Sequence, residues 1–232
     1  MPQVVFLHPI GLDRQIWADI GVPDAAALDL PGHGRTAAVD RVGLAGLVDY
    51  VLAQLTGPAT LVGLSLGGMV AQQVALREPA AVTSLVVACS TSASDPAVML
   101  ERAAATRQGG MAGVLDTTLE RWFTPAALAT PGHPGVEYTR RRLLDDDPEV
   151  IAQYWEAMSA HDVRAQLPSL KVPATFIAGA VDRASSMAVR EEMAKAVPDG
   201  VLRVLDGPHM LPLERPREFT EVLSEHLQRV YG

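Results

Sequence analysis

The chain has 232 residues, of which 48% are hydrophobic and 20% charged, and its 17 Pro and 19 Gly are scattered rather than clustered. This composition is typical of a folded globular protein with one large domain or two small ones, and it excludes a disordered or fibrous chain. Lys and Arg number 19 against 27 Asp and Glu, which gives a net charge of −8. That charge argues against nucleic acid and an anionic membrane surface as partners.

The sequence shows neither a membrane span, nor a secretory signal, nor a pair of cysteines that could form a disulfide. No stretch approaches the roughly 18 consecutive apolar residues of a membrane span, and no basic segment precedes an apolar one at the N-terminus, as a secretory signal requires. The single cysteine, Cys89, cannot form a disulfide within the chain. We therefore expect a cytoplasmic protein.

Short apolar runs typical of buried strands recur along the chain. They cover residues 4–7, 25–30, 60–64, 85–89, 175–178 and 202–205. Stretches of helical length at 44–55, 66–77, 186–197 and 215–230 separate most of them or follow the last one. Strands that are apolar on both faces and alternate with helices predict a parallel sheet covered on both sides. The fold class is therefore expected to be α/β.

The alternation of strands and helices stops between residues 94 and 168, where only helices are indicated. One helix is predicted over 111–121, and another begins at Asp147, which can cap it, with Pro148 in the first helical position. Insertions into open α/β sheets commonly cover the carboxyl ends of the strands, where ligands bind. We therefore predict a helical lid over 94–168 and a core formed by 1–93 and 169–232.

The sequence Gly-Leu-Ser-Leu-Gly at 63–67 lies where the third predicted strand meets the following helix. This setting is typical of a nucleophile elbow, in which the turn strains the backbone of the serine and points its hydroxyl out of the sheet. Gly63 and Gly67 would let strand and helix approach closely. Ser65 is therefore the candidate nucleophile.

A serine nucleophile needs a histidine base and a carboxylate that orients it, in the chain order Ser, acid, His for this architecture. Among six histidines, His209 follows the last predicted strand and therefore lies at the carboxyl end of the sheet, level with Ser65. We expect His226 on the solvated side of the last helix. His8 is expected to brace the loop after the first strand rather than to act in catalysis.

The candidate acid is Asp182, which follows the strand at 175–178 and lies between Ser65 and His209 in the sequence. Asp206 is the main alternative, although a residue three positions before His209 on the same turn more often bonds its own backbone. Asp95 is a more distant alternative. We favour Asp182 over Asp206 and Asp95 as the acid, because it follows directly on the end of a predicted strand.

Hydrolysis through an acyl-enzyme also requires hydrogen-bond donors for the oxyanion. They are expected from the backbone N–H of Leu66, directly after the nucleophile, and from the loop after the first strand. Because Pro9 in that loop has no N–H, the second donor is predicted to be Ile10. This chemistry needs no cofactor, and the three aspartates at 145–147 are interpreted as a solvated loop and helix cap rather than a metal site.

Four segments in order resemble the landmarks of the α/β-hydrolase superfamily and span nearly the whole chain. They are Asp-Leu-Pro-Gly-His-Gly at 29–34, the serine segment at 63–69, the segment from Ala-Gly to aspartate at 178–182, and Gly-Pro-His at 207–209. Members usually begin with a β-hairpin before the strand that here ends in His8. The resemblance therefore implies an α/β-hydrolase fold with six parallel strands and without that hairpin.

Within the superfamily, the predicted lid looks most like that of 3-oxoadipate enol-lactonases. The similarity rests on Gly-Gly-Met at 109–111, Leu-Glu-Arg-Trp-Phe-Thr-Pro at 119–125, and shorter segments at 143–149 and 161–164. The chain departs from the enol-lactonase pattern at His8 and Pro9, where that family tends to carry Asn-Ser. The resemblance implies a small ester or lactone as substrate, such as an enol-lactone with a carboxylate.

Several residues are candidates for contact with that substrate. Trp122, Phe123, Tyr154 and Trp155 either form apolar walls of a pocket or pack inside the lid, and Met210 beside His209 is a further candidate.

An arginine would be needed to bind a substrate carboxylate in a protein of this net charge. Arg121 is the leading candidate, because it stands in the segment that resembles the enol-lactonase lid. The alternative is a solvated arginine paired with Glu120 or Asp116.

These observations predict a cofactor-independent serine hydrolase that cleaves a small ester or lactone. A carbon–carbon bond hydrolase of the same fold would use the same triad, and a perhydrolase or haloperoxidase-like enzyme would require peroxide. A ligand-sensing protein of this fold would bind tightly with negligible turnover, but the intact triad argues against it.

Overall fold

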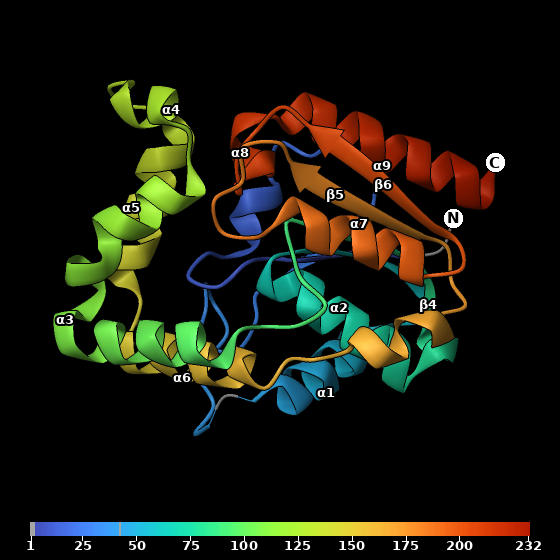
Figure 1. The fold of residues 1–232 in the computed structure, drawn as a ribbon, viewed down its shortest axis with the longest axis horizontal. Helices are drawn as coiled ribbons and strands as arrows, with labels where there is room; N and C mark the ends of the chain where they lie inside the picture. The colour runs from blue at the N-terminus through green and yellow to red at the C-terminus, as the bar shows by residue number, and fades with distance from the viewer. Residues whose placement is uncertain (1–2, 42) are drawn as a thin grey trace.

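The computed structural model describes residues 3–41 and 43–232, so the first two residues of the N-terminal stretch and Val42 lie outside the description. Within these residues the core is one sheet of six parallel strands in the order β2-β1-β3-β4-β5-β6. The strands are β1 (Gln3–Leu7), β2 (Ala26–Leu28), β3 (Ala59–Leu64), β4 (Val82–Ala88), β5 (Ala174–Gly179) and β6 (Gly200–Leu205). The predicted α/β fold with six parallel strands is confirmed (Figure 1).

Helices cover the sheet because its central strands are apolar on both faces; β3 and β5 are buried along their whole length. The core helices are α1 (Leu44–Gln54), α2 (Leu66–Arg77), α7 (Met187–Ala196), α8 (Leu211–Glu214) and α9 (Pro216–Tyr231), with 3-10 turns at Arg14–Trp17, Pro79–Ala81 and Arg164–Ser169. In Figure 1 the ribbons of β5 and β6 run between α7 and α9. None of the helices in the described ranges combines the length and apolar character needed to cross a membrane.

Between β4 and β5 the chain forms four α-helices, which we call the helical insertion: α3 (Pro96–Trp122), α4 (Pro125–Ala129), α5 (Pro134–Asp145) and α6 (Pro148–Ser159). Asp147 caps α6 as predicted, accepting the N–H of Glu149 at 2.8 Å. α3 is interrupted at Gly110, whose φ of 62° is non-helical. As Figure 1 shows, the insertion stands beside the sheet as a separate group of helices, with α3 packed along α6.

One prediction about the last helix is wrong. His226 lies on the buried face of α9, which it shares with Phe219, Val222 and Leu223, and it is only 2% exposed. Its Nδ1 lies 2.8 Å from the hydroxyl of Thr175. Burial lowers the pKa of His226 to about 4, so the ring is neutral and fits an apolar face.

The tightest packing in the fold occurs where β3 turns into α2. A Cβ added at Gly67 would lie 2.1 Å from the carbonyl oxygen of Leu7 in β1, and a Cβ at Gly63 would lie 2.2 Å from the carbonyl oxygen of Gly67. Real Cβ atoms do not approach other atoms this closely. The turn between strand and helix is therefore sharp, and Ser65 within it has a φ of 54°, which a non-glycine residue rarely adopts.

We predict that Gly67→Ala lowers the free energy of unfolding by about 3 kcal/mol, the upper end of the range for overpacking, because a methyl group would push α2 away from β1. Urea denaturation followed by circular dichroism measures the change. Gly113→Ala is the matched control: an added Cβ there meets nothing within 4 Å, and the higher helix propensity of Ala should leave stability unchanged or raise it by up to about 1 kcal/mol. Similar losses for both variants would contradict the packing argument.

Candidate active site

The backbone of Ser65 is held from three directions. Its N–H donates to the carbonyl of Ala88 at 2.9 Å, and its own carbonyl accepts the N–H of Met69 at 3.1 Å and the hydroxyl of Ser90 at 2.7 Å. The side-chain oxygen of Ser65 forms no hydrogen bond within the described part of the chain and borders a cavity. The strained turn thus presents a free hydroxyl at the carboxyl end of β3.

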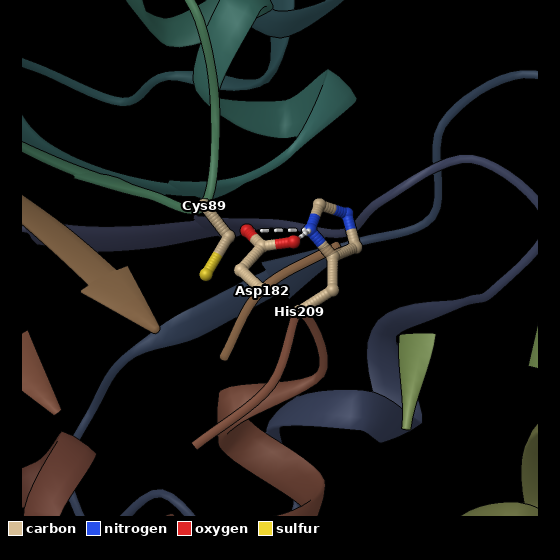
Figure 2. A group of neighbouring side chains, drawn as sticks. All are labelled: Cys89, Asp182 and His209. Carbon is tan, nitrogen blue, oxygen red and sulfur yellow. Dashed lines mark hydrogen bonds and ion pairs between the residues drawn. The ribbon is translucent and has the colours of Figure 1, made fainter. Parts of the chain in front are cut away.

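Asp182 and His209 lie on the loops that follow β5 and β6, and their side chains meet (Figure 2). His209 Nδ1 lies 3.1 Å from both Oδ1 and Oδ2 of Asp182. Both side chains are almost completely buried. With the carboxylate on this side of the ring, Nδ1 carries the proton and Nε2 remains as the hydrogen-bond acceptor.

The two alternative acids have other roles. Asp95 caps α3, accepting the N–H of Ala97 at 2.9 Å. Asp206 stays on the turn after β6, where its carbonyl accepts a hydrogen bond from Arg215 at 2.7 Å. Of the three aspartates, only Asp182 contacts His209.

Asp182 also contacts a buried arginine that the sequence analysis did not identify. Arg190 on α7 is 2% exposed, and its Nη2 donates to Oδ2 of Asp182. The N–H of Ala184 donates to Oδ1 at 2.7 Å. Burial alone would raise the pKa of Asp182, but the charge and hydrogen bond of His209, the charge of Arg190 and the Ala184 N–H hold it below its usual value.

A sequence signal for Arg190 does exist. Positions 190, 193 and 197 fall on one face of a helix, and two of them are the apolar Met193 and Val197. An arginine in that series must be buried or extend to a polar partner, which here is Asp182.

Cys89 is the third side chain in Figure 2, and the sequence analysis gave it no role at the site. The Cys89 Sγ, a carboxylate oxygen of Asp182 and a ring nitrogen of His209 all lie within 4.8 Å of one another. Burial raises the pKa of the Cys89 thiol, and the charge of Asp182 raises it further, so the thiol remains protonated. This group of residues does not suit a metal cation, because a thiol must lose its proton to bind a metal and the Asp182 carboxylate is already paired with Arg190.

Ser65 and His209 line a common cavity of about 260 Å³, which we call the serine cavity. A second cavity of about 360 Å³ is lined mainly by residues of the helical insertion, and we call it the insertion cavity. Both cavities are bordered by the same five residues, Ile10, Val98, Arg102, Trp122 and Trp155. The two cavities therefore lie next to each other.

Two of the predicted aromatic contacts, Trp122 and Trp155, line both cavities. Arg121 lines the insertion cavity. It forms no ion pair with Glu120 or Asp116; its one side-chain hydrogen bond in the described structure runs from Nη2 to the hydroxyl of Thr118 at 3.3 Å.

The structure places the other three candidates for substrate contact outside both cavities. Phe123 is 2% exposed and packs its ring against His133. The hydroxyl of Tyr154 donates to the carbonyl of Pro31 at 2.6 Å. Met210 is fully buried. Tyr154 thus joins the insertion to the core, whereas the ring of Phe123 packs within the insertion.

Ile10 and Leu66, the predicted oxyanion donors, are buried at 2% and 0% exposure. Neither backbone N–H is bonded to another group of the residues described. Nearby, His8 braces the loop as predicted: its Nε2 accepts the N–H of Leu30 at 2.9 Å, and its Nδ1 lies 2.7 Å from the carbonyl of Pro9. Burial lowers the pKa of His8 to about 4, which keeps the ring neutral.

Two curated relatives match almost the whole chain. This chain is 28% identical to the pimeloyl-(acyl-carrier protein) methyl ester esterase of Chromobacterium violaceum, in an alignment that covers 98% of this chain and 94% of that protein. It is 26% identical to 3-oxoadipate enol-lactonase 2 of Acinetobacter baylyi, covering 98% of this chain and 89% of that protein.

Solved structures and the family assignment agree with these relatives. The enol-lactonase from Burkholderia xenovorans has a TM-score of 0.92 at 28% identity, over 98% of this chain and 91% of that one. A hydrolase from Pseudomonas aeruginosa has a TM-score of 0.91 at 29% identity, over 97% of this chain and 89% of that one. Residues 4–222 match the Alpha/beta hydrolase family. The resemblance seen in the sequence landmarks is thus confirmed, and the chain belongs to the alpha/beta hydrolase family.

Proposed function

We propose that this protein is a serine hydrolase that cleaves a small carboxylic ester or lactone through an acyl-enzyme. The observation that carries the proposal is the bond between Asp182 and His209 Nδ1 at the edge of the cavity that Ser65 also lines. The names of its relatives, an esterase and an enol-lactonase, support an ester bond as the one cleaved.

In the first half of the proposed reaction, Ser65 Oγ attacks the ester carbonyl carbon and its proton passes to His209 Nε2. The carbonyl oxygen becomes an oxyanion, which the N–H groups of Ile10 and Leu66 stabilise. The carbon–oxygen bond to the alcohol then breaks, and His209 returns the proton to the leaving oxygen. In a lactone, that oxygen stays tethered to the acyl group.

In the second half, His209 takes a proton from water, and the hydroxide oxygen attacks the acyl carbon. The bond to Ser65 Oγ breaks, and the proton returns from His209 to Ser65. Asp182 accepts a hydrogen bond from the Nδ1–H of His209 throughout, and it stabilises the imidazolium that forms twice in each cycle. Arg190 and the Ala184 N–H keep Asp182 ionised for this task.

Ser65→Ala is expected to lower kcat on p-nitrophenyl acetate by about 10⁴- to 10⁶-fold, because the nucleophile is lost. A fluorophosphonate probe should label the wild-type protein and not this variant, as read by intact-mass spectrometry. Ser94→Ala, in a residue that borders the same cavity, should still be labelled. Retention of a tenth of the activity by Ser65→Ala would show that Ser65 is not the nucleophile.

Asp182→Asn should lower kcat by about four orders of magnitude, because an amide at Nδ1 favours the wrong tautomer of the imidazole. Asp206→Asn removes a carboxylate that makes no contact with His209 and should change kcat little. Steady-state kinetics on the same ester compare the two. A larger loss in Asp206→Asn would refute the assignment of Asp182.

Arg190→Met should lower the free energy of unfolding by about 3 kcal/mol, since it leaves Asp182 in a buried site without its cation. Arg203→Met removes an exposed arginine paired with Glu225 at 3.2 Å and should lower stability by less than about 1 kcal/mol. Urea unfolding at pH 7 compares them, and equal losses would contradict a special role for the buried pair.

The Asp182 pair should also make stability depend on pH. Because the pKa of Asp182 is lower in the folded protein than its unfolded value of about 3.9, its contribution is fully present above that value. The contribution is lost as the pH falls through the folded pKa. In Arg190→Met the loss on acidification below pH 4 should be smaller than in the wild type.

A further inference from the structure

The loop after β1, residues 8–13, carries Ile10, one of the two proposed oxyanion donors, and different parts of the molecule hold its two ends. The core holds the first part. His8 braces the start of the loop, and His33 Nε2 accepts the N–H of Gly11 at 3.0 Å. The far end of the loop is Asp13, whose side-chain partners on other elements belong to the helical insertion.

Asp13, three residues after Ile10, is the point where α5 holds this loop. The hydroxyl of Tyr138 donates to Oδ1 of Asp13 at 2.8 Å and accepts the N–H of Asp13 at 3.3 Å. Arg142 Nε lies 3.1 Å from Oδ2 of the same carboxylate. Because Tyr138 and Arg142 stand four residues apart on α5, they share one face of the helix and reach Asp13 together. Asp13 is only 4% exposed, so water competes little for these contacts.

The same helix also packs against the middle of the loop. A Cβ added at Gly11, where φ is 71°, would lie 2.6 Å from Cδ2 of Leu143 and 3.8 Å from Cη2 of Trp122. The insertion thus contacts the backbone directly after Ile10 as well as the side chain of Asp13. A displacement of α5 would therefore move the backbone that carries the Ile10 N–H.

Arg142 serves a second buried carboxylate besides Asp13. Its Nη2 donates to Oδ1 of Asp146 at 2.6 Å, while Oδ2 of Asp146 is buried without a partner in the described part of the chain. Burial raises the pKa of Asp146 to about 7, and the charges of Asp13 and Asp145 also raise it, whereas Arg142 opposes the rise. Loss of Arg142 would leave two carboxylates close together without a cation. It should therefore disturb Asp13 more than loss of the Tyr138 hydroxyl does.

We propose that Tyr138 and Arg142 are positioning residues for the oxyanion donor: through Asp13 they fix the backbone N–H of Ile10, a residue that borders the cavity of Ser65. The inference rests on the proposed function, which assigns this N–H to the oxyanion. Such donors stabilise a transition state because they are fixed before the reaction begins. The helical insertion therefore takes part in the chemistry as well as forming a wall of the cavity, since the donor is in place only while α5 is docked on the loop.

Steady-state kinetics on p-nitrophenyl acetate test the proposal. Tyr138→Phe and Arg142→Met should lower kcat by roughly 10- to 100-fold, the range for a misplaced group, with the larger loss in Arg142→Met. KM should change by less than about twofold, because the oxyanion exists only in the transition state and the tetrahedral intermediate. Tyr138→Phe removes one hydroxyl, so it tests the proposal even if Arg142→Met fails to fold.

Two control variants match these changes in chemistry but lie away from the loop. Tyr231→Phe removes a hydroxyl that bonds Thr60 at 2.7 Å, at the end of β3 remote from Ser65. Arg140→Met removes an arginine of α5 that lies 3.9 Å from the carboxylate of Asp116. Both should keep the wild-type kcat, whatever they do to the free energy of unfolding.

A trifluoromethyl ketone measures oxyanion stabilisation without turnover. Ser65 Oγ adds to the ketone carbon, its proton passes to His209, and the carbonyl oxygen becomes an oxyanion in the place that the ester oxyanion would take. The inhibition constant of 1,1,1-trifluorohexan-2-one should rise in Tyr138→Phe and Arg142→Met by about the factor by which kcat falls. It should not change in Tyr231→Phe or Arg140→Met.

Hydrogen exchange followed by mass spectrometry reports on the loop itself. A peptide that covers residues 8–13 should exchange faster in Tyr138→Phe and Arg142→Met than in the wild type or the two controls. The proposal is overturned by an unchanged inhibition constant, by unchanged exchange, or by equal effects in the control variants. If the wild type neither cleaves the ester nor binds the ketone while exchange still rises, the proposed function fails and the hold of the insertion on the loop stands.

Discussion

Glycine at position 67 lets α2 rest on the backbone of β1, and the placement of the candidate site follows from that contact. The close approach leaves Ser65 in a left-handed turn at the carboxyl end of β3. Because all six strands described are parallel, the loops after β5 and β6 emerge at the same edge. Asp182 and His209 on those loops therefore meet at this edge, and His209 borders the same cavity as Ser65.

The buried polar groups at this edge form a connected set rather than a row of independent contacts. Asp182 lies between a permanent cation, Arg190, and a ring that is charged only when protonated, His209. With a neutral imidazole, the charges of Asp182 and Arg190 cancel, which makes their burial tolerable. The carboxylate that contacts the His209 ring is thus already fixed in place by Arg190 and the Ala184 N–H.

The sheet and the contact between Asp182 and His209 could be predicted from the sequence because both depend on local patterns: apolar runs mark strands, and chemistry-bearing residues follow their ends. It does not show which side of an insertion helix faces a cavity. Tyr154 and Trp155 are adjacent, so their directions differ by about 100°; Trp155 lines the cavities, whereas Tyr154 points into the packing against Pro31. Arg102, Arg190 and the buried His226 depend in the same way on tertiary packing, which residue type alone does not disclose.

The buried thiol of Cys89 has a consequence for following the motions of the protein. It is the only cysteine in the sequence, it is 1% exposed, and its side chain lies beside Asp182, on the side away from His209 (Figure 2). Cys89 borders the serine cavity but is almost fully buried, so a bulky thiol reagent reacts with it when the packing around that cavity opens locally or when the whole chain unfolds. The rate of alkylation in native buffer would therefore report how often the packing around these side chains opens, in the native sequence and with no engineered label.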